Sequence, residues 1–290
     1  MNTFSIKDLE TISGIKAHTL RIWEQRYKII EPHRTDTNIR LYDDNDLKKI
    51  LNISFLNQKG YKISKIASMN NASLSEKVLE LAQDNIEYPV HVHSLMVSML
   101  ELDEEHFEKT ISRCVQQFGL ENAMIHVIYP FLSRIGLLWQ VGSLNPYQEH
   151  FILHLIRQKI IVAIDSCPHH FSSNTKRFLL YLPSTEFHEV GLLLAHYILK
   201  SRGYRVFYFG QSLPFADLCD ACNLCKPDFT FTIITTLGEQ DLHTLVENAA
   251  NCMPNITHIV SGYHLASIKT KKKNVHLSPN IQSFIEFISR

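Results

Sequence analysis

Several features are absent from this sequence, and each absence removes a class of protein. Its 290 residues contain no run of eighteen apolar residues, so we expect no transmembrane helix. Residues 1–8 lack a basic stretch followed by an apolar core, which argues against a secretory signal. The six cysteines do not form the framework of a small secreted protein. We therefore expect a cytoplasmic, reduced protein that does not contact membranes.

Net charge is also absent, because 29 Lys and Arg residues balance 29 Asp and Glu residues. The charges are nevertheless unevenly distributed. Residues 1–65 contain 12 basic and 8 acidic side chains, whereas residues 66–170 contain 6 and 12. A basic first segment on an otherwise acidic or neutral chain favours local contact with phosphates.

Residues 1–72 have the pattern of short helices around a hairpin. Ile6, Leu9 and Ile12 predict a first helix, capped by Ser5 or Thr3 and ended by Ser13-Gly14. A second helix should begin near residue 16, and helical periodicity resumes over residues 43–60. Alternation after a turn-rich stretch predicts a hairpin, or wing, within residues 34–42. Helix, tight turn and helix is the arrangement that places a second helix in the major groove of DNA.

The remaining residues change character at about position 172. Residues 73–172 predict a four-helix bundle, with helices over 90–102, 107–118, 124–138 and 149–164, and Pro89, Pro130 and Asn145-Pro146 punctuate this segment. Residues 173–290 predict a doubly wound, Rossmann-like parallel sheet, since strands over 177–182, 204–209, 229–234 and 258–260 alternate with helices. Ligands of such sheets bind at the carboxyl ends of the strands.

Residues 1–72, which we call the head, carry a specific resemblance. The string Leu20-Arg21-Ile22-Trp23-Glu24-Gln25-Arg26-Tyr27, followed by the segment from Arg34 to Tyr42, resembles the MerR family. That resemblance implies a winged helix-turn-helix that binds palindromic promoter DNA as a dimer. The candidate DNA-binding residues are Lys16, His18, Thr19, Arg21, Arg26, Tyr27, Arg34, Asn38, Arg40 and Tyr42.

The same residues also have blander interpretations. The charges could form a solvated face, and Arg21 could pair with Glu24 on the helix surface. For Trp23, a place in the core is favoured over a DNA contact.

A second motif, Glu186-Phe187-His188-Glu189-Val190-Gly191, follows the first strand of the sheet. It resembles the acid, His and Gly motif of cobalamin-binding domains, with Glu186 in place of the more usual Asp. The resemblance implies that His188 ligates cobalt, that Glu186 orients it, and that Gly191 admits the nucleotide tail. By the same resemblance, Thr235 and Ser261-Gly262 line the cofactor. Alone, His188 would more often be structural.

Trp139 is followed ten positions later by Glu149-His150, which resembles the light-sensing cobalamin-dependent MerR-type repressors. In those proteins the Trp packs beside the adenosyl group and the Glu-His pair lines the same pocket. Gln140 stands where such proteins often have a His. Glu149-His150 could alternatively be a helix-start pair, since acids favour that end.

Cys219, Cys222 and Cys225 are spaced by threes, which is also typical of iron–sulfur ligands. Their place on a predicted helix among apolar residues favours packing instead.

Together these resemblances imply a repressor, not an enzyme, that binds promoter DNA as a homodimer or homotetramer. It would sense light through adenosylcobalamin bound between the bundle and the sheet domain. One alternative is a regulator that has lost cobalamin, which the departures at Gln140 and Ser261 favour, and that responds to a protein partner or another small molecule. Another is a cobalamin enzyme or carrier, although no substrate barrel is present.

Overall fold

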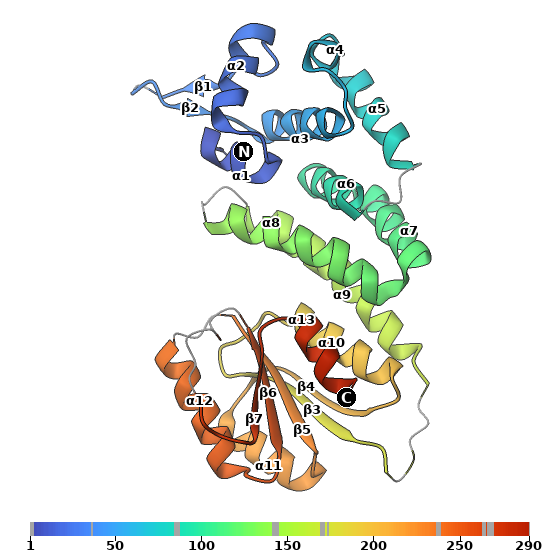
Figure 1. Cartoon of the computed structure of the whole chain (residues 1–290), viewed down its shortest axis with the longest axis vertical. Coiled ribbons are helices and arrows are strands. Elements are labelled where there is room, and N and C mark those ends of the chain that lie inside the picture. Colours follow the sequence, from blue (N-terminus) through green and yellow to red (C-terminus); the bar gives the residue numbers. More distant parts are fainter. Residues whose placement is uncertain are drawn as a thin grey trace. The chain divides into compact units, whose positions relative to one another are not determined.

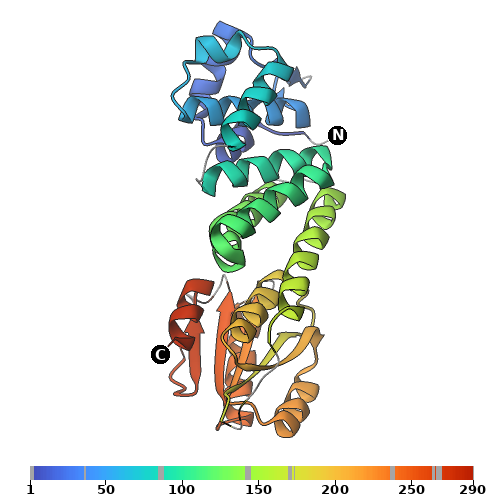
Figure 2. The ribbon, with the colours of Figure 1, turned by 90° about the vertical axis from the view of Figure 1, so that its right-hand side faces the viewer.

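The computed structural model describes residues 3–35, 37–83, 88–140, 145–168, 172, 174–235, 239–262, 265 and 270–289. The chain divides into two compact units, Met1–Leu155 and Ile156–Arg290. Figures 1 and 2 show the elements of each unit. In the described part of the chain, no helix has both the length and the apolar character needed to cross a membrane.

The expected helix-turn-helix and wing are present in the first unit. Helix α1 (Ile6–Ser13) begins at a capping box, in which Ser5 and Asp8 bond each other's backbone N–H groups. Gly14, at φ 74°, ends it in the left-handed conformation. Helix α2 (Ala17–Tyr27) follows, and strands β1 (His33–Arg34) and β2 (Arg40–Leu41) pair antiparallel before α3 (Asp44–Gln58).

The first unit then becomes entirely helical. The predicted helices correspond to α6 (Tyr88–Glu101), α7 (Glu104–Ala123), α8 (Tyr129–Gln140) and α9 (Pro146–Asp165), while α4 (Ile63–Ala67) and α5 (Asn71–Gln83) were not predicted. Gly119, at φ 76°, kinks α7 next to the predicted end at residue 118. Helix α9 continues across the boundary between the units.

The predicted helix over residues 124–138 runs through Pro130 without a break. A π-helical segment, η1 (Met124–Ile128), precedes α8, and the Tyr129 N–H donates to the Met124 carbonyl five residues back. Proline lacks an N–H and crowds the carbonyl four residues before it. The wider turn accommodates this without ending the helix, as π-bulges do elsewhere.

The second unit contains a five-stranded parallel sheet in the order β4-β3-β5-β6-β7. Its strands are β3 (Arg177–Pro183), β4 (Arg205–Leu213), β5 (Phe229–Ile234), β6 (Thr257–Gly262) and β7 (Val275–Ser278). The predicted doubly wound fold is confirmed, although β7 was not predicted. The expected end of β4 at Gly210 is wrong, because the strand passes that residue through a shift in register and continues.

Helices cover both faces of this sheet (Figure 1). On one face, α11 (Phe215–Cys225) and α12 (Glu239–Cys252) share a core with Leu179 and Tyr181 of β3. On the other, α13 (Ile281–Ile288), which was not predicted, packs Phe284 and Phe287 against the rings of Phe231 and Phe229 of β5. Helix α10 (Val190–Ser201) follows the loop after β3 and buries four consecutive side chains, Leu192 to Ala195.

Candidate DNA-binding and cofactor sites

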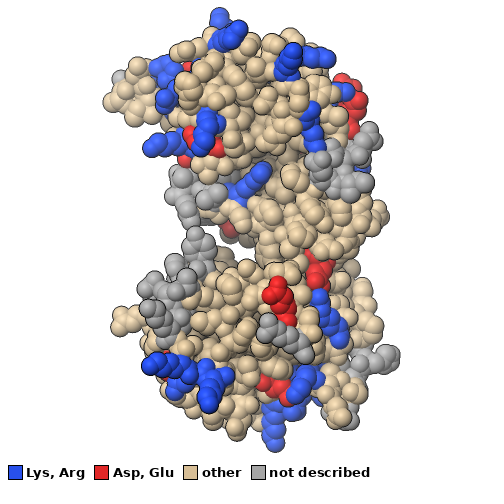
Figure 3. All heavy atoms as spheres, viewed as in Figure 1, with Lys and Arg blue, Asp and Glu red and all other residues tan. Residues whose placement is uncertain are grey.

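Helix α2 has an inner face and an outer face. Leu20 and Trp23 are buried against the rest of the head, so Trp23 belongs to the core. His18, Arg21 and Arg26 are exposed. Lys and Arg side chains are visible on the surface of this unit (Figure 3). The outer face therefore carries positive charge on the second helix of a helix-turn-helix, the helix that enters the major groove of DNA in such folds.

A carboxylate from α1 organises the start of α2. Glu10 accepts hydrogen bonds from the Lys16 ammonium and from the Ala17 backbone N–H, both at 2.9 Å. The Lys16 contact, followed by the Ala17 bond, lowers the pKa of Glu10. Lys16 immediately precedes the helix instead of lying within it.

Glu24 joins α2 to the wing. Arg40 Nε lies 3.2 and 3.1 Å from the two Glu24 carboxylate oxygens, so Glu24 pairs with the wing residue and not with Arg21 as the alternative supposed. The Tyr42 hydroxyl donates to the same carboxylate at 3.4 Å. Tyr42 is only 1% exposed, and burial, then Glu24, raises its pKa to about 12. Tyr42 was a candidate DNA-binding residue, but its side chain is buried and its hydroxyl is bonded to Glu24, so the structure does not present it to DNA.

The wing tip remains accessible. Arg34 Nη1 donates to Asn38 Oδ1 at 2.6 Å, and Asn38 takes the left-handed φ of 64° that a tight turn requires. Both side chains are exposed, as is Ile39. Arg34 is thus held in one direction while its surface stays open to a phosphate.

In the second unit, the loop after β3 is built around Glu186. Its side chain is 0% exposed, and its two carboxylate oxygens accept the backbone N–H groups of Phe187 at 3.1 Å, His188 at 3.2 Å and Thr235 at 2.7 Å. Thr235 Oγ1 also lies 3.1 and 3.0 Å from these oxygens. A buried carboxylate is stable only with such partners, so Glu186 fixes the loop to the end of β5.

His188 is held by this carboxylate. Its Nδ1 lies 2.6 Å from Glu186 Oε1 and 2.9 Å from Thr235 Oγ1, yet the side chain is 59% exposed. When Nδ1–H donates to Glu186, the neutral ring carries its lone pair on Nε2. An oriented imidazole of this kind is what a metal-ligating His requires. The donor set therefore fits cobalt of a cobalamin.

The neighbouring strand end is closely packed. Gly262 pairs with Ile234 of β5, and a Cβ there would lie 2.0 Å from the Ile234 carbonyl oxygen. Ser261 is buried beside it. Thr235 follows Ile234, so these residues share the carboxyl edge of the sheet. Gly191 is the second residue of α10.

The other candidates belong to the first unit. Trp139 lies near the end of α8, and its side chain and that of Gln140 are outside the described residues. Glu149 is half-buried and His150 exposed in the first turns of α9.

Sequence reasoning missed the partners of Glu189. Its carboxylate pairs with Arg157 of α9 at 2.8 Å and accepts from the Tyr208 hydroxyl at 2.8 Å. Gln211 Nε2 donates to Glu189 at 3.2 Å and to the Phe187 carbonyl at 2.9 Å. These contacts hold Phe187 and Glu189, the two residues that flank His188. We call the group a clamp; it consists of Arg157, Glu189, Tyr208 and Gln211. The position of Glu189 next to His188 was its sole signal in the sequence.

Two of the three cysteines of α11, Cys219 and Cys222, have a packing role. Cys222 is buried and Cys219 packs against the same apolar cluster of the sheet. Burial raises the pKa of Cys222 to about 12 and that of Cys219 in the same direction. Both thiols are thereby kept protonated, the form that does not bind metals.

Comparison with known proteins finds two family models that match parts of the chain. Residues 4–72 match the model of the MerR HTH family of regulatory proteins, and residues 92–163 match a B12 binding domain. The second match falls on the helical segment. The chain thus combines a MerR-type helix-turn-helix domain with a B12-binding domain.

Two relatives are similar over most of the chain. The HTH-type transcriptional repressor CarH of Myxococcus xanthus is 24% identical over 87% of this chain and 86% of its own length. The repressor CarA of the same organism is 23% identical over 90% and 86%. The HTH-type transcriptional regulator MlrA of Escherichia coli is 33% identical over 23% of this chain and 27% of its own length. The chain is homologous to CarH and CarA along nearly its full length.

Proposed function

We propose that this chain, which joins a MerR-type head to a B12-binding domain, is a transcriptional repressor that binds promoter DNA and releases it in response to light through adenosylcobalamin. The observation that carries the cofactor half of the proposal is the pair of exposed His188 and buried Glu186. The names of the relatives support a regulator over an enzyme.

At the head, α2 would enter the major groove with its outer face. His18, Thr19 and Arg21, in the first turns of the helix, would meet base edges or phosphates. Lys16, Arg26 and Tyr27 would contact the backbone, and the wing would add Arg34 and Asn38. Arg40 positions the wing through Glu24. A second copy of the chain would supply the other half-site of a palindromic operator.

At the sheet edge, His188 would ligate the cobalt through Nε2 while Glu186 and Thr235 hold Nδ1. Gly191, Thr235, Ser261 and Gly262 would line the nucleotide tail. When bound, adenosylcobalamin supplies a light-sensitive cobalt–carbon bond. Trp139, Glu149 and His150 are proposed as further contacts on the strength of the resemblance.

Helix α9 offers a route for the signal. It carries Glu149 and His150 in its first turns and Arg157 further along, where Arg157 pairs with Glu189 beside His188. Because these residues share one continuous helix, a movement at one end of α9 would displace the residues at the other end.

The test is a spectrum of the purified full chain mixed with adenosylcobalamin, in the dark and after green light, with size-exclusion and operator binding on each sample. We expect coloured protein, a light-dependent change in assembly and loss of DNA binding. His188→Ala should lose the dark spectrum of bound cofactor. A colourless chain that binds DNA equally in dark and light would contradict the proposal, and intact signalling by His188→Ala would favour a regulator without cobalamin.

A further inference from the structure

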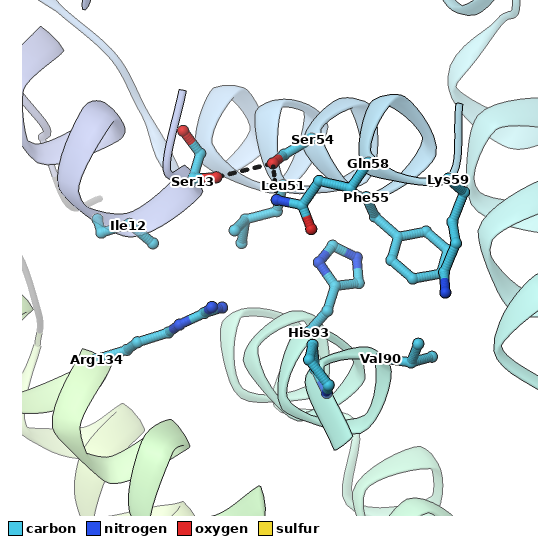
Figure 4. Close-up of a pocket in the computed structure, with 11 residues that line it drawn as sticks. Ile12, Ser13, Leu51, Ser54, Phe55, Gln58, Lys59, Val90, His93 and Arg134 are labelled. Carbon is cyan, nitrogen blue, oxygen red and sulfur yellow. Dashed lines mark hydrogen bonds between the residues drawn. The ribbon is translucent and has the colours of Figure 1, made fainter. Parts of the chain in front are cut away.

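A cavity of about 150 Å³ lies within the first unit, away from every residue assigned above. Helices α1 and α3 of the head form one side, with Ile12, Leu51 and Phe55, and α6 and α8 form the other, with Val90 and Arg134 (Figure 4). An apolar cavity of comparable size can hold a molecule such as benzene. The cavity is therefore large enough for a small ligand that touches both the head and the helical segment.

Arg134 brings a charge to this cavity. Its side chain extends from α8 toward the space below Leu51 (Figure 4). Among the described residues, no hydrogen bond or ion pair engages its guanidinium. Burial lowers its pKa, which reflects the cost of removing this cation from water. An anion in the cavity would offset that cost.

The other polar walls do not supply the anion. Ser54 donates to the Ser13 carbonyl at 2.8 Å, and Gln58 donates to Ser54 at 3.2 Å. His93 is bonded to Asn52 at 3.0 Å, and burial lowers its pKa to about 3, so the ring is neutral. Lys59 adds a second cation, and the residues described around the cavity include no Asp or Glu.

We propose that this cavity binds a small organic carboxylate whose apolar body packs on Leu51, Phe55 and Val90 and whose carboxylate pairs with Arg134. The planar guanidinium can form two parallel hydrogen bonds with a carboxylate. An inorganic anion has no apolar body, so it would not gain the packing against the apolar wall. Because α1 and α3 belong to the DNA-binding head, an occupant would stiffen the head against α6 and α8. The site would thus give the regulator a second, small-molecule input that does not depend on cobalamin.

Benzoate is the probe, with neutral benzamide and inorganic phosphate as comparisons, each titrated into the full chain by calorimetry with and without cobalamin. We expect benzoate to bind at least tenfold more tightly than benzamide or phosphate in both forms. Arg134→Gln should weaken benzoate binding at least tenfold, and Arg134→Lys should weaken it less. Arg113→Gln, which changes an exposed Arg on α7, is the matched control and should leave it unchanged.

Leu51→Trp provides a second variant, since it fills the cavity while leaving Arg134 in place. It should abolish benzoate binding in a protein that still melts cooperatively. Equal binding of benzoate and benzamide, phosphate binding without benzoate binding, no benzoate binding at all, or full binding by Arg134→Gln would each overturn the proposal. These results do not depend on cobalamin, so they separate this site from the proposed light response.

Discussion

The DNA-binding head and the His188 loop present functional groups in opposite ways. In the head, the candidate cations lie within residues 16–40, and most of them are exposed on one helix and one hairpin. In the sheet unit, one exposed imidazole depends on a buried carboxylate and on Thr235, which lies 47 positions along the chain from His188. A polyanion can be met by a local charged surface, whereas a single ligand atom must be aimed by residues from distant strand ends.

The largest expected effect tests this dependence on distant backbone packing. Gly262→Ala would place a Cβ 2.0 Å from the Ile234 carbonyl oxygen at a φ of 146°. We expect it to lower the free energy of unfolding by about 3 kcal/mol, because backbone on both sides must move. Gly203→Ala, at φ 81° with open space around it, is the control and should cost about 1 kcal/mol. Urea denaturation measures the free energy of unfolding of both variants. Equal losses of stability would show that close packing at Gly262 has no special importance.

Glu186→Gln tests the aiming of His188 directly. The amide keeps the size of the side chain but loses the charge that accepts three backbone N–H groups and Nδ1. We expect cobalamin affinity to fall by about 10- to 100-fold, as for other removed partners of metal-ligating His residues. Glu247→Gln on α12 is the control. Equilibrium titration with cobalamin measures the change, and an unchanged affinity would show that His188 needs no orienting partner.

Acidification probes the interior of the first unit. The pKa of His93 is lowered to about 3 by burial and by Arg134, from an ordinary value near 6.5. Below pH 6.5 the unfolded chain takes up this proton before the folded chain does, so stability falls as pH drops from about 6.5 toward 3. Between pH 7 and 5 this amounts to about 2 kcal/mol. Burial also lowers the pKa of His196 to about 4, so His93→Gln should reduce the slope of the stability profile measured by thermal melting without abolishing it. His18→Gln should leave the slope unchanged, and equal slopes for His93→Gln and the parent protein would contradict the assignment.

The smallest effect separates two arginines of the head. Arg26→Ala removes an exposed charge, so we expect DNA affinity to fall by about 1 kcal/mol and the salt slope to shrink by about one, with stability unchanged. Arg40→Ala removes the partner of Glu24 and should lower the stability of the head by about 1 kcal/mol. Fluorescence anisotropy at several salt concentrations, with melting curves, distinguishes them. The distinction fails if both variants lose DNA binding and neither loses stability.

Much of this architecture follows from local patterns. The helix cap, for which Ser5 and Thr3 were the candidates, the break at Gly14 and the strands that become β3 and β5 were predictable because each signal lies within a few residues. The π-helical turn was not predictable, since it depends both on the missing N–H of Pro130 and on the packing of the surrounding helices. The short strand β7 depends on pairing with β6, which no local signal reveals.

The same limit applies to the site. The motif from Glu186 to Gly191 revealed the candidate ligand, because the acid and the His are two positions apart. Tyr42 was misassigned because its hydroxyl turns toward Glu24, eighteen positions earlier in the chain. Arg157 and Tyr208 were missed because only folding brings α9 and β4 to Glu189.

Glu10 gives the head an internal competitor for DNA. Its carboxylate already occupies the first N–H of α2 and the Lys16 ammonium, two groups to which a phosphate would otherwise bind. A phosphate in a wrong register would meet this negative charge, whereas one in the right register would draw Lys16 away from it. If Lys16 contacts DNA as proposed, Glu10 would lower the general affinity for DNA and favour those positions at which a phosphate can replace it, without touching a base itself.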